Sequence, residues 1–226
     1  MEPRDTFSAV VFDLDGTLLD TIDDLADTGN HILSEEGLSP VPVALYRQFV
    51  GRGLRHLIAC LLEHHHADAL DIGMMTRRFS DEYLKRLFSR TKPYDGIEEM
   101  LWRLESAGVS LSVLSNKSDA LVRELVLHYF PRVSFAAVMG ASPVYPRKPA
   151  PDAAHVCARA MNCRPHETAF LGDSGIDMET ARGSGMYAIG AGWGFRDTDE
   201  LLRHGAARIV FHPLEVLPVI LDGRML

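Results

Sequence analysis

Two aspartates separated by one residue follow a short apolar run near the start of the chain. Residues 9–12 are Ala-Val-Val-Phe, Asp13 follows them directly, and Asp15 comes two residues later. Such a run predicts a buried strand, and ligands of open parallel sheets bind just beyond the carboxyl ends of strands. One carboxylate of such a pair can act as a nucleophile while the other moves protons. The pattern predicts a catalytic site, with an ordinary turn rich in Asp and Gly as the alternative.

The close pair of carboxylates also predicts a cation. Two negative groups at this spacing repel each other unless a positive charge lies between them. Mg²⁺ takes oxygen ligands, typically one or two carboxylates together with substrate phosphate. The chain has a net charge of -8, so an anionic substrate would need a local Lys or Arg as well.

Polar residues that suit a phosphate follow two later segments. Ser115 and Asn116 come after the apolar run at residues 109–114, and Lys148 lies in a loop beside two prolines. A hydroxyl and backbone N–H groups at a strand end can bind phosphate, and a lysine in a stiff loop can neutralise it. The alternatives are a helix N-cap for Ser115 and Asn116 and a solvated surface position for Lys148.

A second pair of acidic residues completes the candidate site residues. Asp173 follows the apolar run at residues 168–171, and Asp177 comes four residues later at the start of a predicted helix. Both could face a cation near Asp13. Asp177 could equally be an acid that favours the beginning of a helix.

The elements around these residues predict an α/β protein with an inserted helical domain. Residues 20–91 have helical periodicity and no predicted strand, with the last helix at about residues 71–90. From residue 93 onward predicted strands and helices alternate, which indicates a doubly wound, Rossmann-like parallel sheet. We therefore expect a catalytic core of residues 1–19 and 92–226, interrupted by a helical domain of residues 20–91.

With these motifs the chain resembles the haloacid dehalogenase superfamily, and within it the hydrolases that are similar to phosphoglycolate phosphatase. Residues 13–18 resemble the first motif of that family, Ser115-Asn116 the second, residues 148–152 the third and residues 172–177 the fourth. The helical block at residues 20–91 resembles the mobile cap of this group. The resemblance covers almost the whole chain.

The resemblance implies a Mg²⁺-dependent phosphatase that hydrolyses a small phosphorylated metabolite, such as phosphoglycolate, through an aspartyl-phosphate. Asp13 would be the nucleophile, and Asp15 would be the general acid and base. The phosphate and metal ligands implied by the motifs are Thr17, Ser115, Asn116 and Lys148 for phosphate, and Asp13, the backbone carbonyl of Asp15, Asp173 and Asp177 for Mg²⁺.

Substrate specificity is expected to come from the cap. Arg52 lies between two glycines at the start of a predicted helix, a position that resembles the substrate loop of the family's cap. Arg52 or Arg55 could bind a substrate carboxylate, and a solvated arginine at the beginning of a helix is the alternative for each. The loop at residues 193–196 is a further segment that could border the site.

Other activities of the same superfamily stay open. A pyrophosphatase or a sugar-phosphate mutase would keep every motif, whereas a dehalogenase would not need Asp15 or the second acidic pair. A non-catalytic phosphoryl-binding module is the alternative of another class, and such a module would be expected to lack Asp13 or Lys148.

Composition narrows the partners and the compartment. The chain has 226 residues, is 46% hydrophobic and 24% charged, and has no evident basic patch, so we expect no nucleic-acid partner. No apolar run is long enough to span a bilayer, and residues 1–8 have no apolar leader segment. Three cysteines without metal-type spacing indicate reduced thiols. We expect a cytoplasmic monomer or homodimer.

Overall fold

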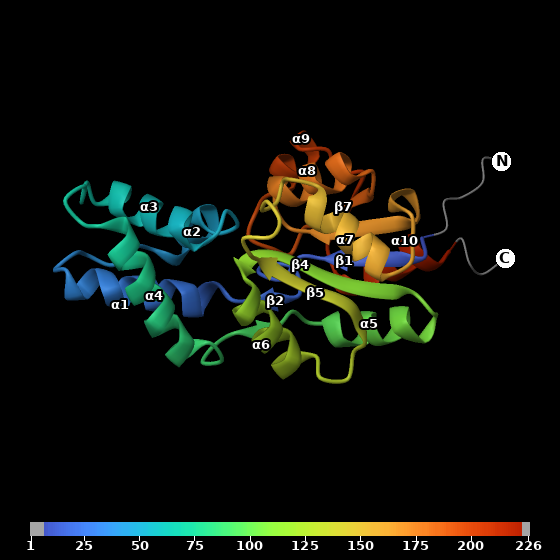
Figure 1. Ribbon diagram of the computed structural model, residues 1–226, viewed down its shortest axis with the longest axis horizontal. Coiled ribbons are helices and arrows are strands. Elements are labelled where there is room, and N and C mark those ends of the chain that lie inside the picture. The colour runs from blue at the N-terminus through green and yellow to red at the C-terminus, as the bar shows by residue number, and fades with distance from the viewer. Residues whose placement is uncertain (1–6, 223–226) are drawn as a thin grey trace. The chain divides into compact units, whose positions relative to one another are not determined.

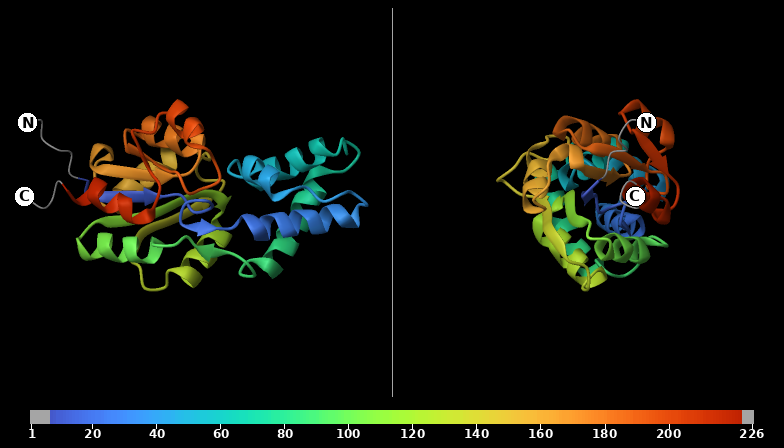
Figure 2. Two further views of the ribbon diagram at one scale, coloured as in Figure 1. Left: turned by 180° about the vertical axis from the view of Figure 1, so that it is seen from behind. Right: turned by 90° about the vertical axis from the view of Figure 1, so that its right-hand side faces the viewer.

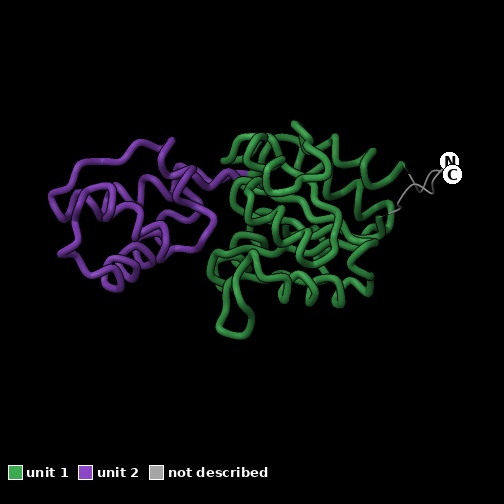
Figure 3. The backbone as a smooth tube through the Cα atoms, turned by 90° about the horizontal axis from the view of Figure 1, so that it is seen from above, with its two compact units in different colours: residues 1–19, 93–226 green, residues 20–92 purple. Residues whose placement is uncertain are grey.

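The structure is a computed structural model that describes residues 7–222. The chain forms two compact units, one of Met1–Leu19 with Pro93–Leu226 and one of Asp20–Lys92 (Figure 3). We call them the sheet unit and the helical unit. The segment on which the expected absence of a leader rests lies mostly outside the described residues.

The sheet unit is built on six parallel strands in the order β5-β4-β1-β6-β7-β8 (Figure 1). The strands are β1 (Ala9–Phe12), β4 (Ser110–Ser118), β5 (Phe135–Ala141), β6 (Thr168–Gly172), β7 (Tyr187–Ala191) and β8 (Arg208–Val210). All four side chains of β1 are fully buried, as expected for a parallel strand covered on both faces. The predicted α/β fold with a Rossmann-like parallel sheet is confirmed.

Helices cover both faces of this sheet. α7 and α8 pack on one face, and α5 and α6 on the other (Figures 1 and 2), while α9 contacts α8 and α10 contacts α5. Their bounds are α5 (Ile97–Ser106), α6 (Asp119–Tyr129), α7 (Asp152–Ala160), α8 (Gly175–Ser184), α9 (Thr198–Arg203) and α10 (Val216–Leu221). On the α7 and α8 side, small residues of α7 such as Ala154 and Ala158 are buried in a core with Phe170 of β6. The apolar layers hold the strands in place, and the strand ends remain available for polar groups.

The helical unit consists of α1 (Ile22–Glu35), α2 (Val43–Phe49), α3 (Leu54–His64) and α4 (Ile72–Arg86). α1 contacts α2 and α4, and α3 also contacts α4. Met75, Phe79 and Tyr83 on α4 are buried, so this face of the helix belongs to the core of the helical unit.

The last helix of this unit ends earlier than predicted. The sequence indicates a helix to about residue 90, whereas α4 ends at Arg86. The carboxylate of buried Asp24 accepts hydrogen bonds from the backbone N–H groups of Arg90 (3.0 Å) and Thr91 (2.8 Å). These bonds hold the chain in a non-helical path, which the periodicity of the sequence does not report.

Two short strands were also missed. β2 (Leu19–Asp20) and β3 (Lys92–Pro93) pair as a two-stranded sheet where the chain enters and leaves the helical unit. The prediction that residues 20–91 contain no strand is therefore wrong at Asp20. Strands of two residues have no detectable alternation, so only their pairing reveals them.

Two predictions from composition can be compared with the described residues. No helix among them is both long and apolar enough to cross a membrane. Cys60, Cys157 and Cys163 are free thiols.

Candidate active site

The ends of three neighbouring strands bring most of the predicted site residues together. β1 lies between β4 and β6 in the sheet. Asp13 follows β1 and donates its backbone N–H to the carbonyl of Leu171 in β6 at 2.9 Å, while Asp173 follows β6. This is the edge of a parallel sheet where ligands bind.

The position of Ser115 and Asn116 differs from the prediction. The sequence indicates a strand that ends at residue 114 and a helix that opens with these two residues, but β4 continues to Ser118, which is the N-cap of α6. After a register shift, β4 still pairs with β5 at Ser118 and Ala141. Pairing between strands extends β4 beyond its apolar run, so the N-cap alternative for Ser115 and Asn116 is wrong.

Lys148 bridges two of the predicted carboxylates. Its Nζ atom donates to Oδ1 of Asp13 at 2.6 Å and to Oδ1 of Asp177 at 2.7 Å. Its side chain is only 4% exposed, and Nζ lies 5.7 Å from the centre of the Phe170 ring. The alternative of a solvated surface lysine is therefore wrong, because Lys148 is a buried cation among acids.

Asn116 holds the backbone of Lys148 with both polar atoms of its amide. The Asn116 side-chain nitrogen donates to the carbonyl of Lys148 at 3.1 Å, and its oxygen accepts the backbone N–H of Lys148 at 2.9 Å. The paired bonds join β4 to the loop that carries Lys148. They fix the position of the Lys148 backbone, from which its side chain extends.

Asp177 combines the two roles that the sequence left open. Its Oδ2 atom accepts the backbone N–H of Ser174 at 3.1 Å and the Ser174 hydroxyl at 2.6 Å, which closes a capping box at the start of α8. Its Oδ1 atom accepts Lys148. Asp177 is therefore a helix-start acid and part of the acidic cluster at once.

Asp173 lies against the loop at residues 193–196, which the sequence marks as a possible border of the site. The backbone N–H of Phe195 donates to Oδ2 of Asp173 at 2.7 Å. A Cβ atom at Gly16 would lie 2.2 Å from that Oδ2, and one at Gly194 would lie 2.2 Å from Cβ of Asp173. Gly16 also has a φ of +87°. Glycines at these positions let two backbone segments approach the carboxylate closely.

Burial changes the acidity of two of these carboxyl groups. It raises the pKa of Asp13 to about 7, against the opposing charge of Lys148 and with the added repulsion of Asp177. Burial, Asp13 and Asp177 also raise the pKa of Asp173 well above its usual range. Burial alone would lower the pKa of Lys148, but the charges of Asp13 and Asp177 outweigh it and raise the pKa. For Asp13 the attraction of Lys148 exceeds the repulsion of Asp177, so burial accounts for the net rise in its pKa.

The same residues fit a divalent cation. Carboxylate oxygens of Asp13, Asp173 and Asp177 all lie within 4.8 Å of one another, and all three residues are buried. Hard oxygen ligands suit Mg²⁺, and a cation would offset the cost of ionising the buried carboxyl groups of Asp13 and Asp173.

Asp15 pairs with a lysine that sequence reasoning missed. Nζ of Lys117 lies 2.8 Å from Oδ1 of Asp15, and the two side chains are 8% and 11% exposed. Lys117 follows Ser115 and Asn116 directly, so its position next to the second motif was the only available signal. The sequence marked residues 193–196 as a segment that could border the site, but not the bond from the Phe195 backbone to Asp173, because a backbone N–H carries no side-chain identity.

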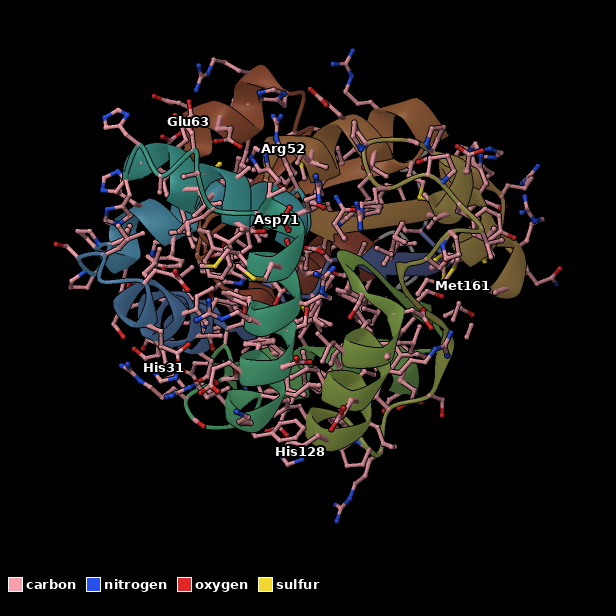
Figure 4. All side chains as sticks on the ribbon, turned by 60° about the vertical axis from the view of Figure 1, so that its left-hand side comes forward. His31, Arg52, Glu63, Asp71, His128 and Met161 are labelled. Atoms are coloured by element: carbon pink, nitrogen blue, oxygen red, sulfur yellow. The ribbon has the colours of Figure 1, made fainter. Side chains whose placement is uncertain are left out.

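The three remaining candidates for binding have different surroundings. Thr17 is fully buried, its hydroxyl has no hydrogen-bond partner among the described residues, and its carbonyl accepts the indole N–H of Trp193 at 3.0 Å. Arg52 belongs to the helical unit, where it is exposed in the turn before α3 (Figure 4). Arg55 lies in the first turn of α3 and is also exposed.

Comparison with known protein families identifies the family of this chain. The family model described as "Haloacid dehalogenase-like hydrolase" matches residues 10–191. The chain belongs to this family. The predicted resemblance to the haloacid dehalogenase superfamily is confirmed.

Three similar proteins carry the name phosphoglycolate phosphatase. A phosphoglycolate phosphatase of Mesorhizobium japonicum is 32% identical over 219 residues, which covers 96% of each chain. One of Caulobacter vibrioides is 35% identical, over 93% of this chain and 89% of that protein. The crystal structure of a candidate phosphoglycolate phosphatase from Lactobacillus delbrueckii subsp. bulgaricus has a TM-score of 0.90 at 30% identity, and covers 95% of this chain and 98% of that one.

Proposed function

We propose that this haloacid dehalogenase-like hydrolase is a Mg²⁺-dependent phosphatase of a small phosphorylated metabolite, with phosphoglycolate as the first candidate substrate. The observation that carries the proposal is the buried ammonium group of Lys148 between Asp13 and Asp177, with Asp173 alongside. This arrangement supplies a carboxylate nucleophile and positive charge for a phosphoryl group. The activity name shared by relatives that align over nearly the whole chain supports the substrate.

The reaction proceeds in two displacements at phosphorus. An oxygen of the Asp13 carboxylate attacks the phosphorus atom, the bond to the leaving oxygen breaks, and Asp15 gives its proton to that oxygen. Asp15, now ionised, takes a proton from a water molecule, which attacks the aspartyl-phosphate and releases inorganic phosphate. Asp13 is regenerated as a carboxylate and Asp15 as an acid, so the cycle closes.

Mg²⁺ would be held by Asp13, Asp173 and the backbone carbonyl of Asp15, with Asp177 nearby. When bound, the ion offsets the repulsion between a carboxylate nucleophile and a phosphate that is also negative. Both oxygens of Asp177 already accept hydrogen bonds, from Lys148 and from Ser174, which favours an indirect role for this residue at the ion.

Lys148 and Ser115 hold the phosphoryl oxygens that do not react. An ammonium group has three donors, and two of those on Lys148 contact acids, so its charge lies close to the nucleophile. Ser115 is buried in β4. Asn116 contributes by holding the backbone of Lys148. The hydroxyl of Thr17, which has no hydrogen-bond partner within residues 7–222, is a further donor.

The helical unit acts as the cap of the phosphatase. In this role it excludes water from the reacting groups and supplies contacts to the leaving group. Arg52 lies between Gly51 and Gly53, whose φ values of +114° and +89° are in the region that favours glycine. We assign Arg52 to a substrate carboxylate. We further propose that the enzyme is a cytoplasmic monomer or homodimer.

Phosphate release from a panel of phosphorylated metabolites tests the proposal. The panel includes phosphoglycolate, pyrophosphate, sugar phosphates and nucleoside monophosphates, each with Mg²⁺ and with a chelator, for the natural chain and Asp13→Asn. We expect Mg²⁺-dependent turnover of phosphoglycolate that the variant loses. Preference for pyrophosphate would replace the substrate, isomerisation of a sugar phosphate would favour a mutase, and binding without turnover would favour a non-catalytic module.

A further inference from the structure

Lys117 contacts the side chain of Asp15 but is not among the residues assigned so far to phosphate or metal. Nζ of Lys117 is 2.8 Å from Oδ1 of Asp15, and Lys117 comes from the last residues of β4. The backbone of Lys117 is tied to the same strand end, because its N–H donates to the hydroxyl of Ser115 at 3.2 Å. One strand end thus carries a predicted phosphate ligand and the partner of Asp15.

The burial of this pair separates it from an ordinary surface contact. The side chains of Lys117 and Asp15 are 8% and 11% exposed. Lys85 and Glu82 on α4 form a pair of the same 2.8 Å length, but the lysine is 71% exposed. Exposed pairs contribute little because water screens them and both side chains lose freedom. A buried ammonium group has lost water as a partner, so it depends more strongly on its contact with a carboxylate.

The backbone on either side of Asp15 is already held without this lysine. The backbone N–H of Gly16 donates to the carbonyl of Leu19 at 2.8 Å, and Asp15 forms an isolated bridge with Leu19. These bonds place the Cα atom of Asp15. The contact with Lys117 adds a constraint on the direction of its carboxyl group.

We propose that Lys117 is the positioning residue of Asp15, and that it aims the carboxyl group at the leaving oxygen without contacting the substrate. This inference rests on the proposed phosphatase function, in which Asp15 moves the protons. A misplacement of about 1 Å in a reacting group can cost ~10²-fold in rate, so the aim of Asp15 has a measurable effect.

Three substrates with different leaving groups separate this role from others. Ethyl phosphate and phosphoglycolate both release an alcohol that needs a proton, and only phosphoglycolate carries a carboxylate. p-Nitrophenyl phosphate releases a phenolate that is stable without a proton. Because kcat/KM reports the steps up to release of the leaving group, later hydrolysis of the aspartyl-phosphate does not enter the comparison.

The experiment measures kcat/KM with Mg²⁺ for the natural chain, Lys117→Met, Lys117→Arg, Asp15→Asn and the double variant. We expect Lys117→Met to lower kcat/KM by ~10- to 100-fold on ethyl phosphate and on phosphoglycolate, and by less than about 3-fold on p-nitrophenyl phosphate. These losses do not exceed the ~10²- to 10⁴-fold that a general acid contributes. Lys117→Arg keeps the charge and should lose less. In the Asp15→Asn background, Lys117→Met should change the rate less than about 3-fold, because the two residues act as a unit.

The control is Lys85→Met, which removes the exposed pair of equal length and should leave all three substrates unaffected. A loss on phosphoglycolate alone would make Lys117 a ligand of the substrate carboxylate and would overturn the inference. Equal losses on all three substrates, or a full loss in the Asp15→Asn background, would overturn it too while the phosphatase function stands. If the natural chain hydrolyses none of the three substrates, the proposed function itself fails and the inference with it.

Discussion

The Nζ atom of Lys148 lies 2.6 Å from Oδ1 of Asp13, so the proposed nucleophile is held by a buried counter-charge. Lys148 reaches this position because Asn116 holds its backbone and Asp177 accepts a second hydrogen bond. The ammonium group keeps one oxygen of Asp13 in place. It also brings positive charge to the point where an anionic phosphate would approach.

Replacing Lys148 with methionine should therefore reduce catalysis far more than removing a surface lysine. Loss of one preorganised donor to a developing charge typically costs ~10² to 10³ in rate, and we expect a loss of kcat/KM in that range for Lys148→Met. Steady-state phosphate release measures it. Lys92→Met, at an exposed position, is the control, and equal activities of the two variants would contradict the role of Lys148.

Gly194→Ala should weaken metal binding. The new Cβ atom would lie 2.2 Å from Cβ of Asp173 and 2.5 Å from the carbonyl oxygen of Gly16, so Asp173 must move. We expect the stabilisation by Mg²⁺, measured as a rise in Tm, to shrink. Gly183→Ala is the matched control, because its Cβ would meet only Pro151 at 3.9 Å. If Gly194→Ala keeps the full rise in Tm on adding Mg²⁺, metal binding does not depend on the position of Asp173.

Asp24→Ala should destabilise the helical unit. The buried carboxylate accepts the backbone N–H groups of Arg90 and Thr91 and the hydroxyl of Thr91, and its removal leaves those donors unsatisfied. We expect a loss of about 3 kcal/mol in the free energy of unfolding, measured by urea denaturation. Asp23→Ala, which removes a half-exposed partner of Arg90, should cost less than about 1 kcal/mol. Similar losses would refute the assignment of Asp24.

Metal-free protein should lose stability as the pH rises from about 4 to about 7. The pKa of Asp13 is about 7 in the folded state and 3.8 as a reference, so between these values the folded state holds a proton that the unfolded chain has released. Under that condition the free energy of unfolding falls as the pH rises. Asp13→Asn should have a flatter profile in a chelator, and a slope unchanged by the substitution would contradict this.

Mg²⁺ should reverse that loss. The ion binds the ionised carboxylates and replaces the protons of Asp13 and Asp173. The rise in Tm on adding Mg²⁺ should therefore be larger at about pH 7.5 than at about pH 5, where both groups hold protons in the absence of metal.

The sequence predicted the sheet and most of the acidic cluster because both depend on local patterns. Asp13 and Asp173 each follow an apolar run that is long enough to identify as a strand, and their positions at strand ends follow from the parallel topology. Lys117 was missed for the opposite reason. Its contact with Asp15 depends on how far β4 extends through pairing with β5, and the apolar pattern of β4 ends at Leu114.

Contacts made by the backbone were equally invisible in the sequence. The carboxylates of Asp24 and Asp173 accept backbone N–H groups of Arg90 and Phe195, and any residue type except proline provides such a donor. The early end of α4 and the bond that joins the predicted border loop at residues 193–196 to Asp173 therefore required the structure.

Burst kinetics of Asp15→Asn with p-nitrophenyl phosphate test the central claim, that Asp13 is phosphorylated, most directly. The phenolate leaves without a proton, so the first displacement proceeds, while hydrolysis of the aspartyl-phosphate lacks its base and slows by about 10² or more. The account predicts a burst of about one p-nitrophenolate per active site and, by mass spectrometry of the acid-quenched protein, a phosphate on Asp13. Turnover by the natural chain, with no burst in the variant and no phosphate on Asp13, would contradict it.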